Sequence, residues 1–149
     1  MNWNTFPRSL AIAVAVQVIC QVVKFATASF RLKKLSWRHL ATFGGMPSAH
    51  SAFVTALATS IGIFEGFGTD LFALAAVFGG IVIFDAYKLR GNVQKQAIVL
   101  NRIQSRALPE AERLTINEMV GHTVPEIVAG IALALVVAAP LALLLSRAQ

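Results

Sequence analysis

The sequence predicts an all-α integral membrane protein, a helical bundle with about four transmembrane helices and an amphipathic helix on the cytoplasmic side. Hydrophobic residues make up 56% of the 149 residues and charged residues only 13%, and the mean hydropathy is +0.68. A soluble domain of this size needs more polar surface. Several apolar runs are also long enough to cross a bilayer, which takes about 20 helical residues. Residues 1–149 are therefore interpreted as a single membrane-embedded domain.

The four predicted spans cover residues 7–30, 47–64, 71–87 and 125–145. In three of them small residues recur every four positions, a spacing that lets helices pack closely in lipid. These residues are Ala52, Ala56 and Ser60; Ala76 and Gly80; and Gly130, Ala134 and Ala138. Lys24 interrupts the first span near its end, where a charge is costly and indicates function. Alternatively, its side chain could simply reach the interface.

The stretch between the last two spans, residues 91–122, is polar enough to lie outside the bilayer core. Apolar residues recur there at helical spacing among basic ones, which predicts an amphipathic helix on the membrane surface. Pro109 interrupts this pattern, and residues 115–118 match a capping box that predicts a further short helix.

The charge distribution predicts the topology. The formal net charge of +6 is interpreted as a sign of membrane orientation and of attraction to anionic lipid, not of nucleic-acid binding. Basic residues gather in segments 31–48 and 88–122: Arg31, Lys33, Lys34 and Arg38, then Lys88, Arg90, Lys95, Arg102, Arg106 and Arg113. The positive-inside rule places both segments in the cytoplasm and both termini outside.

The turn at residues 44–52 reads Gly-Gly-Met-Pro-Ser-Ala-His-Ser-Ala. Glycines permit a tight backbone, and Pro47 suits the first turn of a helix. Ser48 and His50 would then lie beside free backbone N–H groups, which form a ready anion site. The alternative is a loop that ends in an ordinary membrane helix.

Two further polar segments, residues 85–90 and 121–126, are predicted to meet this turn at the same face. Lys24 and Arg90 could neutralise phosphate oxygens there. A neutral histidine can attack phosphorus when a carboxylate holds its other ring nitrogen, and His122 and Glu126 are four positions apart. The second histidine, His50, could protonate the leaving oxygen.

Each of these assignments has a simpler alternative. Residues 123–126 themselves match a capping box, so Glu126 could only cap the last span. His50 could be a packed interface histidine. Asp85 could only pair with Lys88, three positions further on.

The combined motifs resemble the type 2 phosphatidic acid phosphatases, which share their site with vanadium haloperoxidases, and above all the small divergent branch of that superfamily. The matching parts are Lys24 and residues 44–52, 85–90, 96–101 and 121–126. The resemblance implies that His122 is the nucleophile, that Glu126 orients it and that His50 is the acid. It further implies phosphate binding by Lys24, Gly45, Ser48 and Arg90, with Asp85, Gln96 and Asn101 in support.

The sequence departs from the family pattern in several places. The Arg that usually stands six residues before the nucleophile is replaced by Ile116, and no Arg-Pro follows the lysine of the first span. Glu126 replaces Asp, and Ala49 replaces Gly. Lys88 and Gly91 stand where Gly and a second Arg are commoner in the branch. Arg90 must therefore supply much of the guanidinium role.

The sequence thus predicts a metal-independent lipid phosphatase that needs no cofactor and faces the cytoplasm, in a bacterial inner membrane. Its substrate is expected to be a phosphomonoester or diphosphate of a membrane lipid: phosphatidate, phosphatidylglycerophosphate or an isoprenyl diphosphate. Hydrolysis would pass through a phosphohistidine. The bilayer and the lipid are the expected partners, and the oligomeric state is left open. The alternative is a non-catalytic lipid- or anion-binding membrane protein, and haloperoxidase activity is a more distant third.

Overall fold

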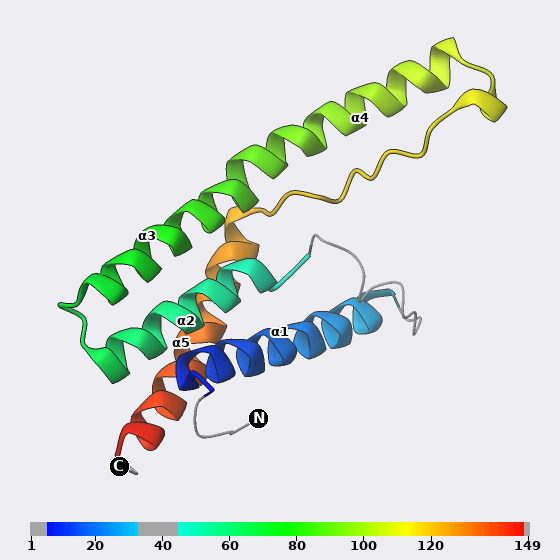
Figure 1. The fold of residues 1–149 in the computed structure, drawn as a ribbon. Helices are drawn as coiled ribbons and strands as arrows, with labels where there is room; N and C mark the ends of the chain where they lie inside the picture. Colours follow the sequence, from blue (N-terminus) through cyan, green and yellow to red (C-terminus); the bar gives the residue numbers. More distant parts are fainter. Residues whose placement is uncertain (1–5, 33–44, 148–149) are drawn as a thin grey trace.

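The computed structural model of the chain describes residues 6–32 and 45–147, which form helices and loops without a strand (Figure 1). Their order is α1 (Arg8–Leu32), α2 (Ala49–Glu65), α3 (Asp70–Phe84), the π-helical turn η3 (Asp85–Leu89), α4 (Arg90–Ala107), the 3₁₀ turn η4 (Glu110–Glu112) and α5 (Val124–Arg147). The predicted all-α class is confirmed. The basic loop with Lys33, Lys34 and Arg38 lies outside the described residues, as does Gly44.

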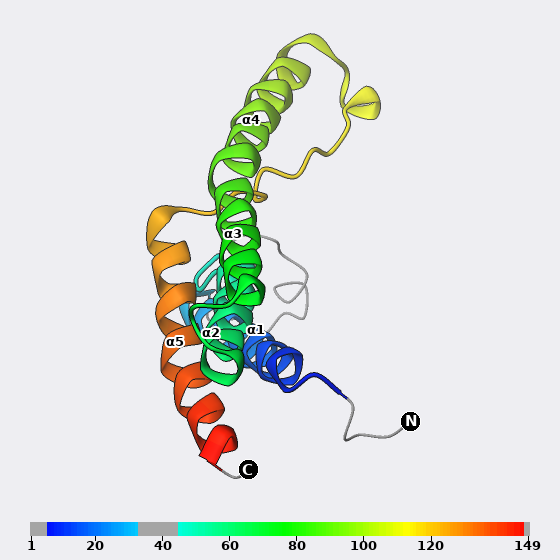
Figure 2. The same cartoon turned by 60° about the vertical axis from the view of Figure 1, so that its left-hand side comes forward.

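Among the described residues, three helical stretches are long and apolar enough to cross a membrane: Arg8–Thr27, Asp70–Ala107 and Val124–Arg147. The remaining predicted span, residues 47–64, corresponds to α2. This helix has 17 residues, the lower limit of the length that crosses a bilayer. It is the central helix, because α1, α3 and α5 all pack against it (Figure 2). The helical membrane class is therefore confirmed.

Helix α4 continues the axis of α3 through η3, so that α3 and α4 form one rod (Figures 1 and 2). The rod has 38 residues and is about 57 Å long at the helical rise. A hydrocarbon core is only about 30 Å thick. The rod is therefore longer than one crossing of the bilayer needs. Figures 1 and 2 show that α4 projects beyond the bundle and does not lie across its end, as a helix on the membrane surface would.

Residues 113–123 are not helical, so the short helix predicted from a capping box at 115–118 is wrong. The Asn101 side chain of α4 donates to the Ile116 carbonyl over 2.9 Å and to the Glu118 carboxylate over 2.8 Å. The Leu114 N–H donates to the Gln104 side chain over 2.7 Å. These polar side chains of α4 hold the segment extended along the helix, and Glu118 bonds to Asn101 instead of capping a helix.

The small-residue repeats of α2 and α5 are buried as predicted. Gly130 lets α5 lie directly against the start of α2, because a Cβ there would lie 2.4 Å from the Ser48 carbonyl oxygen. On α3 the predicted register is wrong. Gly79 is the buried residue and faces Val54 of α2, whereas Ala76 and Gly80 are exposed.

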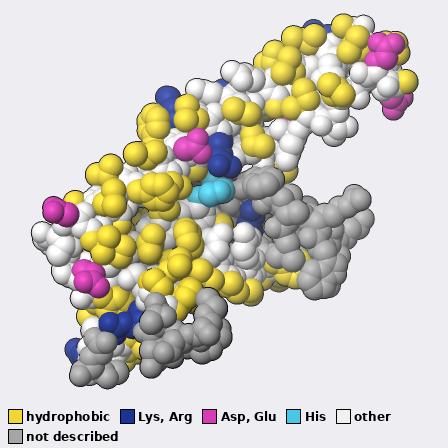
Figure 3. All heavy atoms as spheres, viewed as in Figure 1, with side chains coloured by type: hydrophobic (Ala, Val, Ile, Leu, Met, Phe, Trp, Pro, Cys, Tyr) yellow, Lys and Arg dark blue, Asp and Glu magenta, His cyan; other side chains and the backbone are white. Residues whose placement is uncertain are grey.

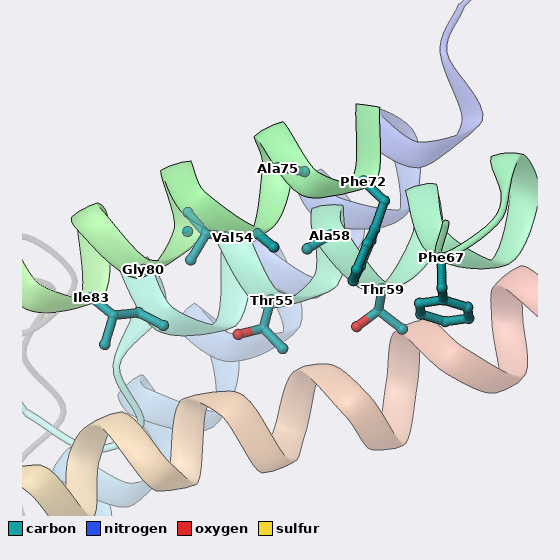
Figure 4. A pocket seen from close by; sticks show the side chains of 11 residues that line it. Val54, Thr55, Ala58, Thr59, Phe67, Phe72, Ala75, Gly80 and Ile83 are labelled. Atoms are coloured by element: carbon teal, nitrogen blue, oxygen red, sulfur yellow. The ribbon is translucent and has the colours of Figure 1, made fainter. Parts of the chain in front are cut away.

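A groove of about 360 Å³ runs between α2 and α3 (Figure 4). Small side chains leave it hollow, and most of its lining is apolar. Phe67 and Phe72, whose rings meet edge to face 5.1 Å apart, lie at one end. Val54 and Ile83 lie toward the other end, which leads to the predicted site.

Candidate active site

The start of α2, the turn η3 and the start of α5 meet at one end of the bundle (Figure 1). Two backbone hydrogen bonds fix this meeting. The Ser48 N–H donates to the Glu126 carbonyl over 2.9 Å, and the His122 N–H donates to the Ala86 carbonyl over 3.1 Å. The three predicted polar segments are therefore joined through their main chains.

Ser48 caps α2, which begins at Ala49. Its buried Oγ accepts from the Ser51 N–H over 3.4 Å and from the Ser51 hydroxyl over 3.1 Å. The prediction that Pro47 forms the first turn is wrong, because Pro47 precedes the cap. The hydroxyl hydrogen of Ser48 can still donate to an anion, and its role toward phosphate stays a prediction.

The carboxylate of Glu126 makes both contacts that the sequence offered as alternatives. Its Oε2 lies 3.1 Å from Nδ1 of His122 and accepts from the Thr123 N–H over 3.0 Å. Glu126 is thus the cap of α5 and the partner of His122 through the same oxygen. A carboxylate at Nδ1 favours the tautomer that leaves Nε2 of His122 with its lone pair.

The two histidine rings lie next to each other. Their centroids are 5.8 Å apart and their planes meet at 63°. Nε2 of His122 and Nδ1 of His50 are buried, and neither has a hydrogen-bond partner among the described residues. Since an unpaired buried polar atom is costly, these two nitrogens indicate a place prepared for a ligand.

Lys24 is buried in α1, with 5% of its surface exposed. A Cβ on Gly45, whose φ is +104°, would lie 3.3 Å from Cε of the lysine. The turn therefore lies directly on the lysine stem. The Lys24 ammonium also interacts electrostatically with Glu126. This burial argues against a side chain that merely reaches the interface.

Asp85 pairs with Arg90 and not with Lys88, because Nε of Arg90 donates to its Oδ2 over 2.8 Å. The two residues are five positions apart, and the Arg90 N–H also donates to the Asp85 carbonyl. In an α-helix residues at this spacing do not share a face, but a π-helical turn aligns them. The ion pair holds one edge of the guanidinium and leaves its terminal nitrogens available to another anion.

Lys24, Asp85, Arg90 and His122 all lie within electrostatic range of His50. Side chains from α1, α2, η3, α4 and the start of α5 therefore form one cluster. Figure 3 shows a histidine with basic and acidic side chains near the middle of the face, with hydrophobic side chains to the left of them.

Two predicted supporting residues lie elsewhere. Gln96 is exposed on α4, and Asn101 holds the returning segment about 16 Å along the helix from Arg90. The amide next to this segment is that of Gln94, which was not predicted from the sequence, and its Oε1 accepts from the Gly121 N–H over 3.2 Å. A Cβ on Gly121 would lie 2.9 Å from Cα of Gly91. No local pattern in the sequence marks Gln94, because its partner Gly121 lies on a separate segment.

The fold and the cluster together define a class of protein: a helical membrane protein with two adjacent histidines, a carboxylate bound to one of them, a buried lysine, and an arginine paired with an aspartate. Residues 7–137 match the sequence profile of the Divergent PAP2 family. The chain belongs to this family.

One relative is the uncharacterized membrane protein YuiD of Bacillus subtilis (strain 168), which is 33% identical over 152 residues. The match covers 91% of this chain and 95% of the relative. No solved structure matches the chain significantly.

Proposed function

We propose that this PAP2-related membrane protein is a lipid phosphatase that works through a phosphohistidine. The observation that carries the proposal is the state of His122. Its Nδ1 is held by Glu126, and its Nε2 is buried without a partner in the described part of the chain. Family membership supports the same reading.

In the proposed reaction, Nε2 of His122 attacks phosphorus and the bond to the leaving oxygen breaks. His50 gives that oxygen a proton, while Glu126 stabilises the positive imidazole. Lys24 and Arg90 neutralise the oxygens of the transferring phosphoryl group. Water then attacks the phosphohistidine and gives up a proton to His50, which releases phosphate and restores both histidines.

The groove between α2 and α3 supports a lipid as the substrate. Val54 lies one turn from His50, and Ile83 lies two residues before Asp85, so the groove leads to the cluster. From Phe72 to Ile83 it runs for about 16 Å, close to one half of a hydrocarbon core of about 30 Å. A single lipid tail could therefore lie in the groove with its phosphate at the histidines.

The decisive test is phosphate release by the purified protein from a panel of lipid phosphates in detergent. We expect release that persists in EDTA, because no three metal-binding side chains lie together among the described residues. Vanadate should inhibit more strongly than phosphate, because it mimics pentacoordinate phosphorus. Binding without release would instead identify a lipid-binding protein, and activity lost in EDTA but restored by Mg²⁺ would contradict the histidine mechanism.

We also propose that the site faces the cytoplasm of a bacterial inner membrane, as the basic segments favour. Cysteines introduced singly at Gly68 and Ser105 should label from outside and inside, respectively, in a Cys20→Ser background. Gly68 is exposed with open space around it, Ser105 is exposed on α4, and Cys20 is buried. Labelling of intact cells with an impermeant maleimide measures this, and reversed accessibility would place the site on the outer side.

A further inference from the structure

A second pocket, of about 440 Å³, adjoins His122 between the start of α4 and the start of α5. Its lining includes Lys88 and Lys95 and contains no aspartate or glutamate. Neither lysine forms an ion pair within the described part of the chain. The pocket is therefore a positively charged space beside the proposed nucleophile.

The two lysines are placed along one face of the rod formed by η3 and α4. They are seven positions apart, which corresponds to about 10 Å along a helix. Lys88 lies between Asp85 and Arg90 on the rod, so it is the lysine nearer to the guanidinium that would hold the phosphate to be cleaved. Lys95 lies about two turns further along the rod.

Two side-chain amides add neutral hydrogen-bond donors to the two lysines. Asn92 and Gln94 line the pocket. The side-chain oxygen of Gln94 accepts from the Gly121 N–H, so the NH₂ group of the same amide remains to donate. Ammonium and amide donors without a competing carboxylate form an environment that binds an anion.

We propose that this pocket binds the second phosphate of a lipid that carries two, while the phosphate to be cleaved lies at His122. This proposal rests on the proposed function and narrows its substrate class. It favours lipids with an internal phosphodiester or a diphosphate over phosphatidate, which has one phosphate. A diphosphate reaches only Lys88, whereas a phosphodiester separated by a glycerol also reaches Lys95.

The test compares Lys88→Ala and Lys95→Ala with Arg102→Ala, which removes an exposed cation of α4 outside the pocket. The measurement is kcat/KM in detergent for phosphatidate, phosphatidylglycerophosphate and an isoprenyl diphosphate. Lys88→Ala should lower it for both two-phosphate lipids by about tenfold more than for phosphatidate. Lys95→Ala should do so only for phosphatidylglycerophosphate, and Arg102→Ala should leave all ratios unchanged.

Equal losses for all three lipids, or equal losses in Arg102→Ala, would overturn the second-phosphate site. Lipid binding separates this failure from failure of the proposed function. In a His122→Ala background, which cannot turn over, the Kd for each lipid in nanodiscs should show the same lysine dependence. A lysine-dependent Kd without any hydrolysis by wild type would leave the pocket standing and refute the phosphatase. Hydrolysis whose rate and Kd do not depend on the lysines would support the phosphatase and refute the second-phosphate pocket.

Discussion

His122→Ala is expected to abolish phosphate release from every substrate, with a loss in turnover of about 10⁴-fold or more. Nε2 of this residue is the buried nitrogen that would bond to phosphorus, and its other nitrogen is held by Glu126. No other group of the cluster is placed as a nucleophile in the proposed reaction. Release of phosphate from purified protein measures the effect, for a lipid phosphate and for an aryl phosphate.

His50→Ala is the matched comparison, because its ring lies 5.8 Å from that of His122. Its loss should be smallest for the aryl phosphate, whose leaving group needs little protonation. Phosphohistidine should be trapped by acid quenching in His50→Ala and be absent from His122→Ala. The opposite trapping pattern would exchange the two roles.

Glu126→Gln is expected to lower turnover by about 10²-fold or more while thermal stability stays near that of wild type. The structure makes this substitution informative, because one oxygen serves both His122 and the Thr123 N–H. An amide oxygen still accepts from Thr123 and preserves the cap. It stabilises a positive imidazole poorly. Turnover and Tm measured on the same preparation separate the two contributions.

Glu126→Asp and Glu126→Ala are the comparison variants for Glu126→Gln. The aspartate keeps the charge but shortens the reach, so its turnover should lie between wild type and glutamine. The alanine removes cap and charge together and should lower both Tm and turnover. Nearly full turnover in Glu126→Gln would show that this carboxylate only caps α5, and the His122–Glu126 pair would have no role in the chemistry.

The sequence alone determined the class of protein, and it predicted the contact between His122 and Glu126. Burial in lipid requires long apolar helices, so composition and run length were sufficient to predict the helical membrane class. The four-residue repeats of α2 and α5 gave their buried faces, because the period of a helix is local. The spacing of His122 and Glu126 likewise predicted a contact within one turn, since the distance between such positions depends on few dihedral angles.

Only the tertiary structure decided the partners that depend on irregular or distant backbone. The pairing of Asp85 with Arg90 follows from a π-helical turn, which shifts the helical register by one residue. The choice of Gln94 over Gln96 depends on where the extended segment before His122 crosses α4. That crossing brings Gly121 against Gly91, residues far apart in the chain. Such contacts are set by the packing of separate elements, and no local period in the sequence encodes them.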